Sequence, residues 1–408
     1  MIEHMYRTEH LKRNQNLLFW GKAFVRLNIL NAIVTLFYLH RGVEINEIFY
    51  LSIVWSLSTL LFEVPTGYLA DRFGRKRTLI LGAFLLALSW VATLFATSFP
   101  AFVIVFVIMS ASFSCFSGTE EAFLYDSLKE LGEDKEMTKH NGRLHSAQHF
   151  FNIIVPILGA WIAKDLTEFQ FSILIWVNIF AVIAGLLVFF FLTEPKHTKN
   201  VTEYEKGIFR ESFETILHEP FLFRASMNKL LIFIASFLVW RAYQPFLYEH
   251  GVSIFWLGVF YFIMHGICFI GHQQIGRIEK ILGTTRALFW SIALMIVSLV
   301  GVFLTDISWL LFVFILTTIV LETVREPVFA STMNSRINSR SRATTLSNLN
   351  VFKAILDIPI LFFAGWIAKI NLEFVFLVSI GLCVIALIFF SIRKRDLIIL
   401  IPQEEFMP

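Results

Sequence analysis

Apolar stretches of about 20 residues recur along the whole chain, and short polar segments separate them. Residues 78–95 contain no charged residue, and residues 49–69 contain a single one, Glu63. A helix needs about 20 apolar residues to cross a bilayer. Only 16% of the 408 residues are charged and 57% are hydrophobic, whereas about a quarter of the residues of a soluble domain are charged. The sequence therefore predicts an all-α integral membrane protein.

Twelve apolar stretches of this kind can be placed along the chain. Their even number puts the two chain ends on the same side of the membrane. The predicted spans are residues 17–39, 47–69, 76–96, 99–124, 145–163, 170–192, 222–246, 255–275, 286–304, 308–332, 344–367 and 372–391.

Positive charge is distributed unequally between the two sides that these spans define. Arg41, Lys164 and Lys369 fall in loops on one side, and all the other loop and terminal cations fall on the opposite side. Cytoplasmic loops of membrane proteins carry an excess of Lys and Arg. We therefore expect both termini in the cytoplasm.

Two segments in different halves of the chain resemble each other. Residues 155–164 read VPILGAWIAK, and residues 358–369 read IPILFFAGWIAK. A duplication of six helices in the same orientation accounts for this similarity. The predicted organisation is a six-helix bundle at 1–192, a cytoplasmic linker at 193–221, and a second six-helix bundle with a short cytoplasmic tail at 222–408.

The loop between the second and third predicted spans carries the most distinctive motif. Residues 67–77 read GYLADRFGRKR and combine one carboxylate, two glycines and four cations. Gly67 allows close approach of the helix ends, and Gly74 permits a positive φ. Asp71 can accept hydrogen bonds from the free N–H groups at the start of the next helix.

This spacing, Gly-x-x-x-Asp-Arg-x-Gly-Arg-Lys-Arg, resembles the loop between helices 2 and 3 of the major facilitator superfamily. The resemblance implies twelve transmembrane helices arranged as two six-helix bundles that are related by an internal repeat. It also implies a secondary transporter with a cytoplasmic gating latch, formed here by Gly67, Asp71, Arg72, Gly74 and Arg75. The alternative for this loop is a basic turn that only orients the protein in the membrane.

The chain departs from the pattern of the antiporters of that family at two places. Their helix 5 carries Gly-Pro-x-x-Gly-Gly, of which Pro156 and Gly159 remain here, while Val155 and Ala160 replace two of the glycines. Many of the proton antiporters have an Arg in helix 4 where this chain has Ser114. Proton coupling would therefore need another route, through Glu120 and Glu121.

Ionisable groups inside the predicted spans are costly to bury and mark candidate sites. Arg26 lies near the middle of the first span and requires an anion, and Glu63, Glu120 and Glu121 lie at a matching depth. A structural Arg26–Glu63 pair and a substrate-binding Arg26 are the two interpretations, of which the pair is slightly favoured. Glu120 and Glu121 point about 100° apart, so only one of them can face a cavity squarely.

The second half has its own set of charges. Glu322, Arg325 and Glu326 share one helix face by their spacing, so that two carboxylates accompany one cation. Lys353 and Asp357 are four residues apart and can neutralise each other. The candidates for proton coupling are Glu63, Glu120, Glu121, Glu322, Glu326 and Asp357.

Aromatic and amide side chains crowd the outer end of the seventh span. Trp240, Arg241 and Tyr243, with Gln244 beside them, offer ring faces and hydrogen bonds to a ligand. An aromatic belt at the membrane interface is the alternative. The candidates for substrate binding are Arg26, Trp240, Arg241, Tyr243 and Arg325.

Other classes of protein find no support in the sequence. The net charge of +3 is small for a nucleic-acid-binding protein. We find no His or Cys set at metal-ligand spacing, and no nucleophile or phosphate-binding loop. We therefore expect neither an enzyme nor a cofactor or metal.

Proton-coupled efflux of amphipathic or cationic compounds is the leading expectation for function, because acids are in excess within the spans and the interior is rich in the 46 Phe residues. Uptake or exchange of an anionic metabolite, held by Arg26 and Arg325, is the alternative. A non-transporting membrane receptor or scaffold is the alternative of another class. As a transporter the protein would act as a monomer in the inner (plasma) membrane, with a small-molecule substrate, protons and the lipid bilayer as partners.

Overall fold

The computed structural model describes residues 2–196, 219–334 and 342–393. Most of the predicted cytoplasmic linker, at 197–218, and the predicted C-terminal tail, at 394–408, lie outside the described residues.

The described chain is helical, and eight of its helices are long and apolar enough to cross a membrane. An all-α membrane fold is therefore confirmed. The helices are α1 (Ile2–Val25), α2 (Val34–His40), α3 (Ile45–Phe73), α4 (Arg75–Phe95), α5 (Phe99–Phe116), α6 (Thr119–Leu131), α7 (Met137–Phe150), α8 (Val155–Ile162), α9 (Glu168–Phe190), α11 (Pro220–Glu249), α12 (Ile254–Leu282), α13 (Thr284–Phe303), α14 (Ser308–Asn334), α15 (Arg342–Ile370) and α16 (Phe374–Phe389), with short 3-10 turns at Asn31–Ile33 and Asp134–Glu136.

The chain forms two compact units that divide three of the long helices between them. Unit 1 contains residues 1–201, 244–265 and 357–370, and unit 2 contains residues 202–243, 266–356 and 371–408. Residues of α11, α12 and α15 therefore belong to both units. The division into bundles at 1–192 and 222–408 stays a prediction.

Three predicted spans are interrupted in the structure, which corrects the expectation of continuous helices there. The span predicted at 17–39 breaks between α1 and the 3-10 turn that precedes α2, the span at 99–124 breaks between α5 and α6, and the span at 145–163 breaks between α7 and α8.

Local sequence explains the three interruptions. Asn28 accepts a hydrogen bond at its Oδ1 from the N–H of Leu30 at 3.1 Å, a turn that competes with the helix. Gly118 adopts a φ of 68° between α5 and α6. Pro156 is the second residue of α8 and has no N–H to donate to residue 152, so it interrupts the helix and is tolerated in the first turn of a new one.

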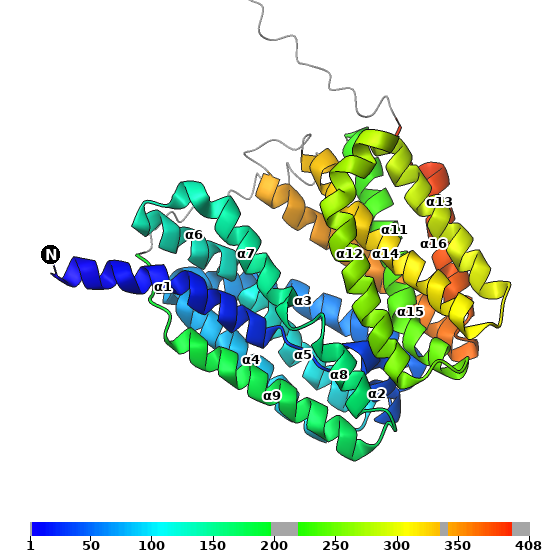
Figure 1. Cartoon of the computed structure of the whole chain (residues 1–408), viewed down its shortest axis with the longest axis horizontal. Coiled ribbons are helices and arrows are strands. Elements are labelled where there is room, and N and C mark those ends of the chain that lie inside the picture. Colours follow the sequence, from blue (N-terminus) through cyan, green and yellow to red (C-terminus); the bar gives the residue numbers. More distant parts are fainter. Residues whose placement is uncertain (1, 197–218, 335–341, 394–408) are drawn as a thin grey trace, which may run out of the picture. The chain divides into compact units, whose positions relative to one another are not determined.

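Unit 1 is held together by close packing of α1, α4 and α9, which lie side by side in Figure 1. Its buried core includes Leu79, Phe116, Phe123 and Phe189. A glycine allows α8 to approach the broken first span, because a Cβ added at Gly159 would lie 2.0 Å from the carbonyl oxygen of Ile29. Any larger residue would separate these two segments.

Unit 2 packs α13 against α14 and α16. Its buried core includes Phe221, Leu222, Leu288 and Phe329. The side chain of Asn228 on α11 donates to the carbonyl oxygens of α16 near its end, at Ala386 (3.3 Å) and Phe390 (3.1 Å).

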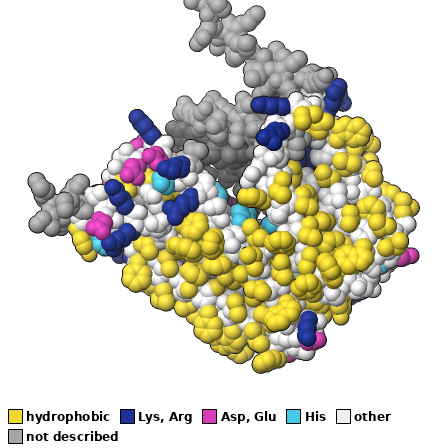
Figure 2. Space-filling view, in the orientation of Figure 1, with side chains coloured by type: hydrophobic (Ala, Val, Ile, Leu, Met, Phe, Trp, Pro, Cys, Tyr) yellow, Lys and Arg dark blue, Asp and Glu magenta, His cyan; other side chains and the backbone are white. Residues whose placement is uncertain are grey.

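Large apolar side chains remain exposed on the predicted spans. Val64 is 78% exposed, Leu61 69% and Phe180 64%. In Figure 2, hydrophobic side chains cover most of the visible described surface, and charged side chains gather in separate groups. Such an extensive apolar surface is compatible with lipid rather than with water.

Candidate functional site

The predicted latch loop is built around Gly74, which ends α3 and precedes α4 with a φ of 101°. The first two N–H groups of α4, at Arg75 and Lys76, donate to the two carboxylate oxygens of Glu194 at 2.8 Å each. We expected Asp71 to accept these hydrogen bonds, and the structure corrects this expectation. Glu194 follows α9, which packs against α4, so the fold brings it to the helix start.

Arg75 fastens the start of α4 to α6. Its Nη1 lies 2.6 Å from Oδ2 of Asp126 and also donates to the carbonyl oxygen of Ala122. The other two predicted latch residues are less constrained. Arg72 is exposed and donates to the hydroxyl of Tyr68, and a Cβ added at Gly67 would meet no described atom within 4 Å.

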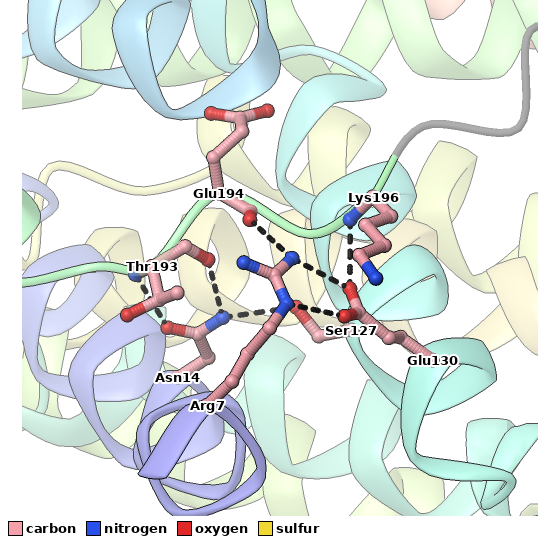
Figure 3. Close-up of polar contacts among 7 residues, drawn as sticks. All are labelled: Arg7, Asn14, Ser127, Glu130, Thr193, Glu194 and Lys196. Carbon is pink, nitrogen blue, oxygen red and sulfur yellow. Dashed lines mark hydrogen bonds and ion pairs between the residues drawn. The ribbon is translucent and has the colours of Figure 1, made fainter. Parts of the chain in front are cut away.

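A polar cluster next to the latch ties the segment after α9 to α1 and α6 (Figure 3). Nε of Arg7 lies 2.6 Å from Oε1 of Glu130, and the N–H of Lys196 donates to Oε2 of Glu130 at 2.7 Å. Asn14 of α1 exchanges two hydrogen bonds with the backbone of Thr193, at 2.8 and 2.9 Å. The segment that positions Glu194 is therefore anchored on both sides.

The broken first span takes its hydrogen bonds from side-chain amides. The N–H of Asn28 donates to Oδ1 of Asn152 at 3.2 Å, and the N–H of Ile29 donates to Oδ1 of Asn178 at 3.1 Å. Nδ2 of Asn152 also donates to the carbonyl oxygen of Arg26 at 2.8 Å. A bilayer core contains no water to form hydrogen bonds with the free backbone groups of a broken helix, so these amides take the place of water.

The side-chain amide of Gln244 forms two hydrogen bonds with the backbone of the same span. Oε1 of Gln244 accepts from the N–H of Thr35 at 2.7 Å, and its Nε2 donates to the carbonyl oxygen of Asn31 at 3.1 Å. We expected Gln244 to bind a ligand, but the structure uses its amide to complete the backbone of the first span. Nδ2 of Asn31 donates to the hydroxyl of Tyr261 at 3.2 Å.

The charges of the first and fourth spans meet at the breaks. Nζ of Lys22 lies 2.7 Å from Oε2 of Glu120, and Nη2 of Arg26 lies 4.0 Å from Oε1 of Glu120. Lys22 and Glu120 are each 4% exposed. Glu120 lies in the first turn of α6, where the helix dipole favours a negative charge.

The expected Arg26–Glu63 pair is therefore wrong, because the carboxylate beside Arg26 is Glu120. The break at Gly118 changes the direction of α6, so its side chains do not lie where a continuous helix would place them. Glu63 is half-buried on α3. Glu121 diverges from Glu120 as expected, with its side chain 49% exposed and Oε1 3.1 Å from Nε2 of His145.

A cavity of about 190 Å³ opens beside Arg26 in unit 1. The guanidinium carbon of Arg26 lies 4.8 Å from the ring centroid of Phe113 and 5.3 Å from that of Phe116. Trp55 and Trp90 also line the cavity. The arrangement combines one cation, side-chain amides and aromatic faces, which is how small-molecule sites are built.

The aromatic candidates of α11 are packed within unit 2. Tyr243 is fully buried, with its ring centroid 5.2 Å from that of Trp240. The guanidinium carbon of Arg241 lies 4.9 Å from the ring centroid of Phe237. Their role in substrate binding stays a prediction.

Unit 2 contains a second cavity, of about 560 Å³, lined by Glu322, Glu326 and Lys229 among others. Nζ of Lys229 lies 2.5 Å from Oε1 of Glu326. Buried Arg325 donates instead to Oδ1 of Asn228 at 2.6 Å. Arg325 is therefore not the ion-pair partner of the two acids that the spacing suggested, because Lys229 of α11 takes that place for Glu326.

The remaining predicted acid, Asp357, is buried in unit 1, where its Oδ2 accepts from the hydroxyl of Ser56 at 3.4 Å.

Sequence reasoning missed Glu194 and the three asparagines Asn28, Asn152 and Asn178. For the three asparagines, the available signal was an uncharged amide inside an apolar stretch, whereas only ionisable groups were considered as candidates.

The fold is that of a multi-pass membrane protein in which two interrupted spans line a cavity. The family model of the Major Facilitator Superfamily matches residues 19–358, so the chain belongs to that superfamily. Its members are carriers rather than enzymes.

Known proteins agree with this assignment. The uncharacterized MFS-type transporter YxaM of Bacillus subtilis (strain 168) is 26% identical over 245 residues, 56% of each chain. The chain spans about half the length of the curated relatives that it matches. A bacterial homologue of the iron transporter ferroportin, in an inward-facing state, has a TM-score of 0.72 and 14% identity over 93% of this chain and 99% of its own. The nucleoside transporter NupG has a TM-score of 0.66 and 14% identity over 93% of this chain and 97% of its own. These two structures share the fold with the chain.

Proposed function

We propose that the chain moves a small organic molecule across the inner (plasma) membrane by alternating access, driven by protons. The observation that supports this proposal is that two interrupted spans, the first and the fourth, line the cavity beside Arg26. Irregular backbone is tolerated at membrane depth only where it is buried in protein or lines a cavity. Discontinuous helices form the substrate sites of many secondary transporters.

The lining of this cavity supports an amphipathic substrate. Trp55, Trp90, Phe113 and Phe116 offer apolar faces, and Arg26, Asn28 and Asn31 offer polar groups. The sequence favoured efflux of amphipathic or cationic compounds, with an anionic metabolite as the alternative. Both remain candidate substrates of one carrier, and the positive charge of Arg26 in the cavity favours the anion.

The coupling proton is assigned to the cavity of unit 2. Lys229 neutralises Glu326 there. Within the described residues, Glu322 has no cation within 4.0 Å and accepts only a long hydrogen bond, 3.5 Å, from the hydroxyl of Thr323. A carboxyl group that is held in a cavity with no cation close enough for a direct ion pair is suited to gain and lose a proton.

The orientation and oligomeric state belong to the same proposal. The distribution of Lys and Arg supports cytoplasmic termini, and the monomer expected from the sequence is part of the same proposal.

Reconstitution into liposomes tests the proposal. A substrate is first selected from a library by the thermal shift that it causes at two pH values. We then expect transport of this substrate to be accompanied by proton movement across the membrane, seen with a pH-sensitive dye. Glu322→Gln should abolish the proton signal while the protein still inserts. Ligand binding without any movement of ligand or protons would contradict the proposal and favour the receptor or scaffold.

A further inference from the structure

We propose that Arg26 binds the anionic group of the substrate, and that the substrate is a small organic monoanion with an aromatic or apolar body. This inference rests on the proposed function and names the substrate class of the same cavity.

The first argument is the count of charges at the break. Lys22, Arg26 and Glu120 meet there, and the described ion pairs give neither cation any other carboxylate within 4.0 Å. Lys22 holds Glu120 at 2.7 Å, whereas Arg26 is 4.0 Å away. One positive charge is therefore in excess, and it belongs to Arg26. A buried charge without a partner is costly, so the site favours a ligand with one negative charge.

The second argument is unused hydrogen-bonding capacity. Nε of Arg26 is buried and has no hydrogen-bond partner among the described residues. The guanidinium group presents donors in a planar fork that matches an oxyanion at two oxygens. The side chain of Arg26 is 24% exposed, so this group can be reached from the cavity that it lines.

The third argument is the size and chemistry of the cavity. Its volume of about 190 Å³ is below the roughly 300–1,000 Å³ of pockets for drug-sized ligands. Phe113 and Phe116 flank the guanidinium group, and Trp55 and Trp90 line the remaining wall. The site therefore suits a molecule with about one ring and argues against large drugs.

Glu120 is the carboxylate that balances the charge of Lys22 in this site. Its Oε1, the oxygen that faces Arg26, has no hydrogen-bond partner among the described residues. When a ligand anion reaches Arg26, Glu120 keeps the charge of Lys22 and the start of α6 as its partners. A ligand can thus bind Arg26 without leaving a second buried anion unpaired.

Binding of three one-ring probes to the purified full-length protein tests the proposal. The probes are benzoate, phthalate and benzyltrimethylammonium, measured by calorimetry at constant ionic strength. We expect benzoate to bind more tightly than both the dianion and the cation. Binding of the cation in place of benzoate would overturn the charge assignment.

Variants locate the anion. Arg26→Met should weaken benzoate binding about 10- to 100-fold, the loss expected for hydrogen bonds to a charged group. Arg26→Lys keeps the charge without the fork and should give a smaller loss. The matched control is Arg143→Met, because Arg143 also lies over a ring, that of Phe19, but is exposed and does not line the cavity. Unchanged benzoate binding in a folded Arg26→Met protein would overturn the proposal.

Failure of this inference differs from failure of the proposed function. Proton-coupled movement of a cation, with no benzoate binding, would leave the transporter intact and refute the anion site. Benzoate binding that needs Arg26, with no movement of any ligand, would keep the site and refute the transporter.

Discussion

The carboxylate of Glu194 accepts the N–H of Arg75 at 2.8 Å, although 119 residues separate them in the sequence. Its second oxygen accepts the N–H of Lys76. The start of α4, which is the second half of the latch loop, is thus capped by the first residues of the predicted linker. A change in the position of that segment and a change in the latch are therefore coupled.

Removal of this cap should destabilise the protein. Glu194→Ala leaves the first two N–H groups of α4 without their acceptors and should cost about 0.5–2 kcal/mol, seen as a lower melting temperature of the purified protein. Glu136→Ala is the control, because Glu136 is exposed and its bond to Lys139 lies on the surface. Equal melting temperatures for Glu194→Ala and the wild type would refute the capping role.

The two glycines of the latch should differ in their tolerance of side chains. Gly74→Val places a β-branched residue at a φ of 101° and brings a Cβ to 3.1 Å from the carboxyl carbon of Glu194. Backbone strain of this kind costs about 1–3 kcal/mol. We expect turnover to be lost while membrane insertion is kept, since insertion depends on the apolar spans. Gly67→Val is the matched control for stability, because no described atom lies within 4 Å of its Cβ.

Asp71→Asn should also abolish turnover without affecting insertion, because the latch must open and close between two states. Full transport activity in both Asp71→Asn and Gly74→Val would reduce this loop to a basic turn that sets orientation.

The amides of the broken first span should be structurally essential. Asn178→Leu removes the acceptor of the buried N–H of Ile29. An unsatisfied buried donor costs about 1–3 kcal/mol, measurable by denaturant or thermal unfolding in detergent. Asn16→Leu is the control, since Asn16 is exposed on α1. Comparable stability of the two variants would show that the break finds other partners.

The sequence predicts those features of this protein that depend on local pattern. Apolar length predicts the helices, the motif at residues 67–77 indicates the family, and Gly74 needs only its own conformation. The first break at Asn28 carries no proline or glycine, so its signal is weak. Glu194, Asn152 and Asn178 reach their partners across the bundle. Such contacts depend on how the helices pack against one another, and the spacing of residues along the sequence does not predict that packing.

Proton coupling should depend on Glu322. Glu322→Gln should remove the pH dependence of transport in liposomes, because an amide cannot exchange the proton. Glu326→Gln should instead lower stability by leaving Lys229 unpaired, and Lys229→Met together with Glu326→Gln should restore it. If wild-type pH dependence persists in both glutamine variants, coupling lies in the acids of unit 1, at Glu63 or Glu120.

The partner of each cation in the first span can be measured by two double-mutant cycles. Lys22→Met or Glu120→Gln alone leaves a buried charge unpaired and should cost about 3–5 kcal/mol, whereas the double change should recover most of that stability. Arg26→Met and Glu63→Gln should instead have additive effects on unfolding, because Arg26 lies beside Glu120. Arg26→Met alone should change stability little and remove anion binding, since its charge is reserved for the ligand. A strong coupling energy between Arg26 and Glu63 would restore the structural pair and leave the cavity without its excess cation.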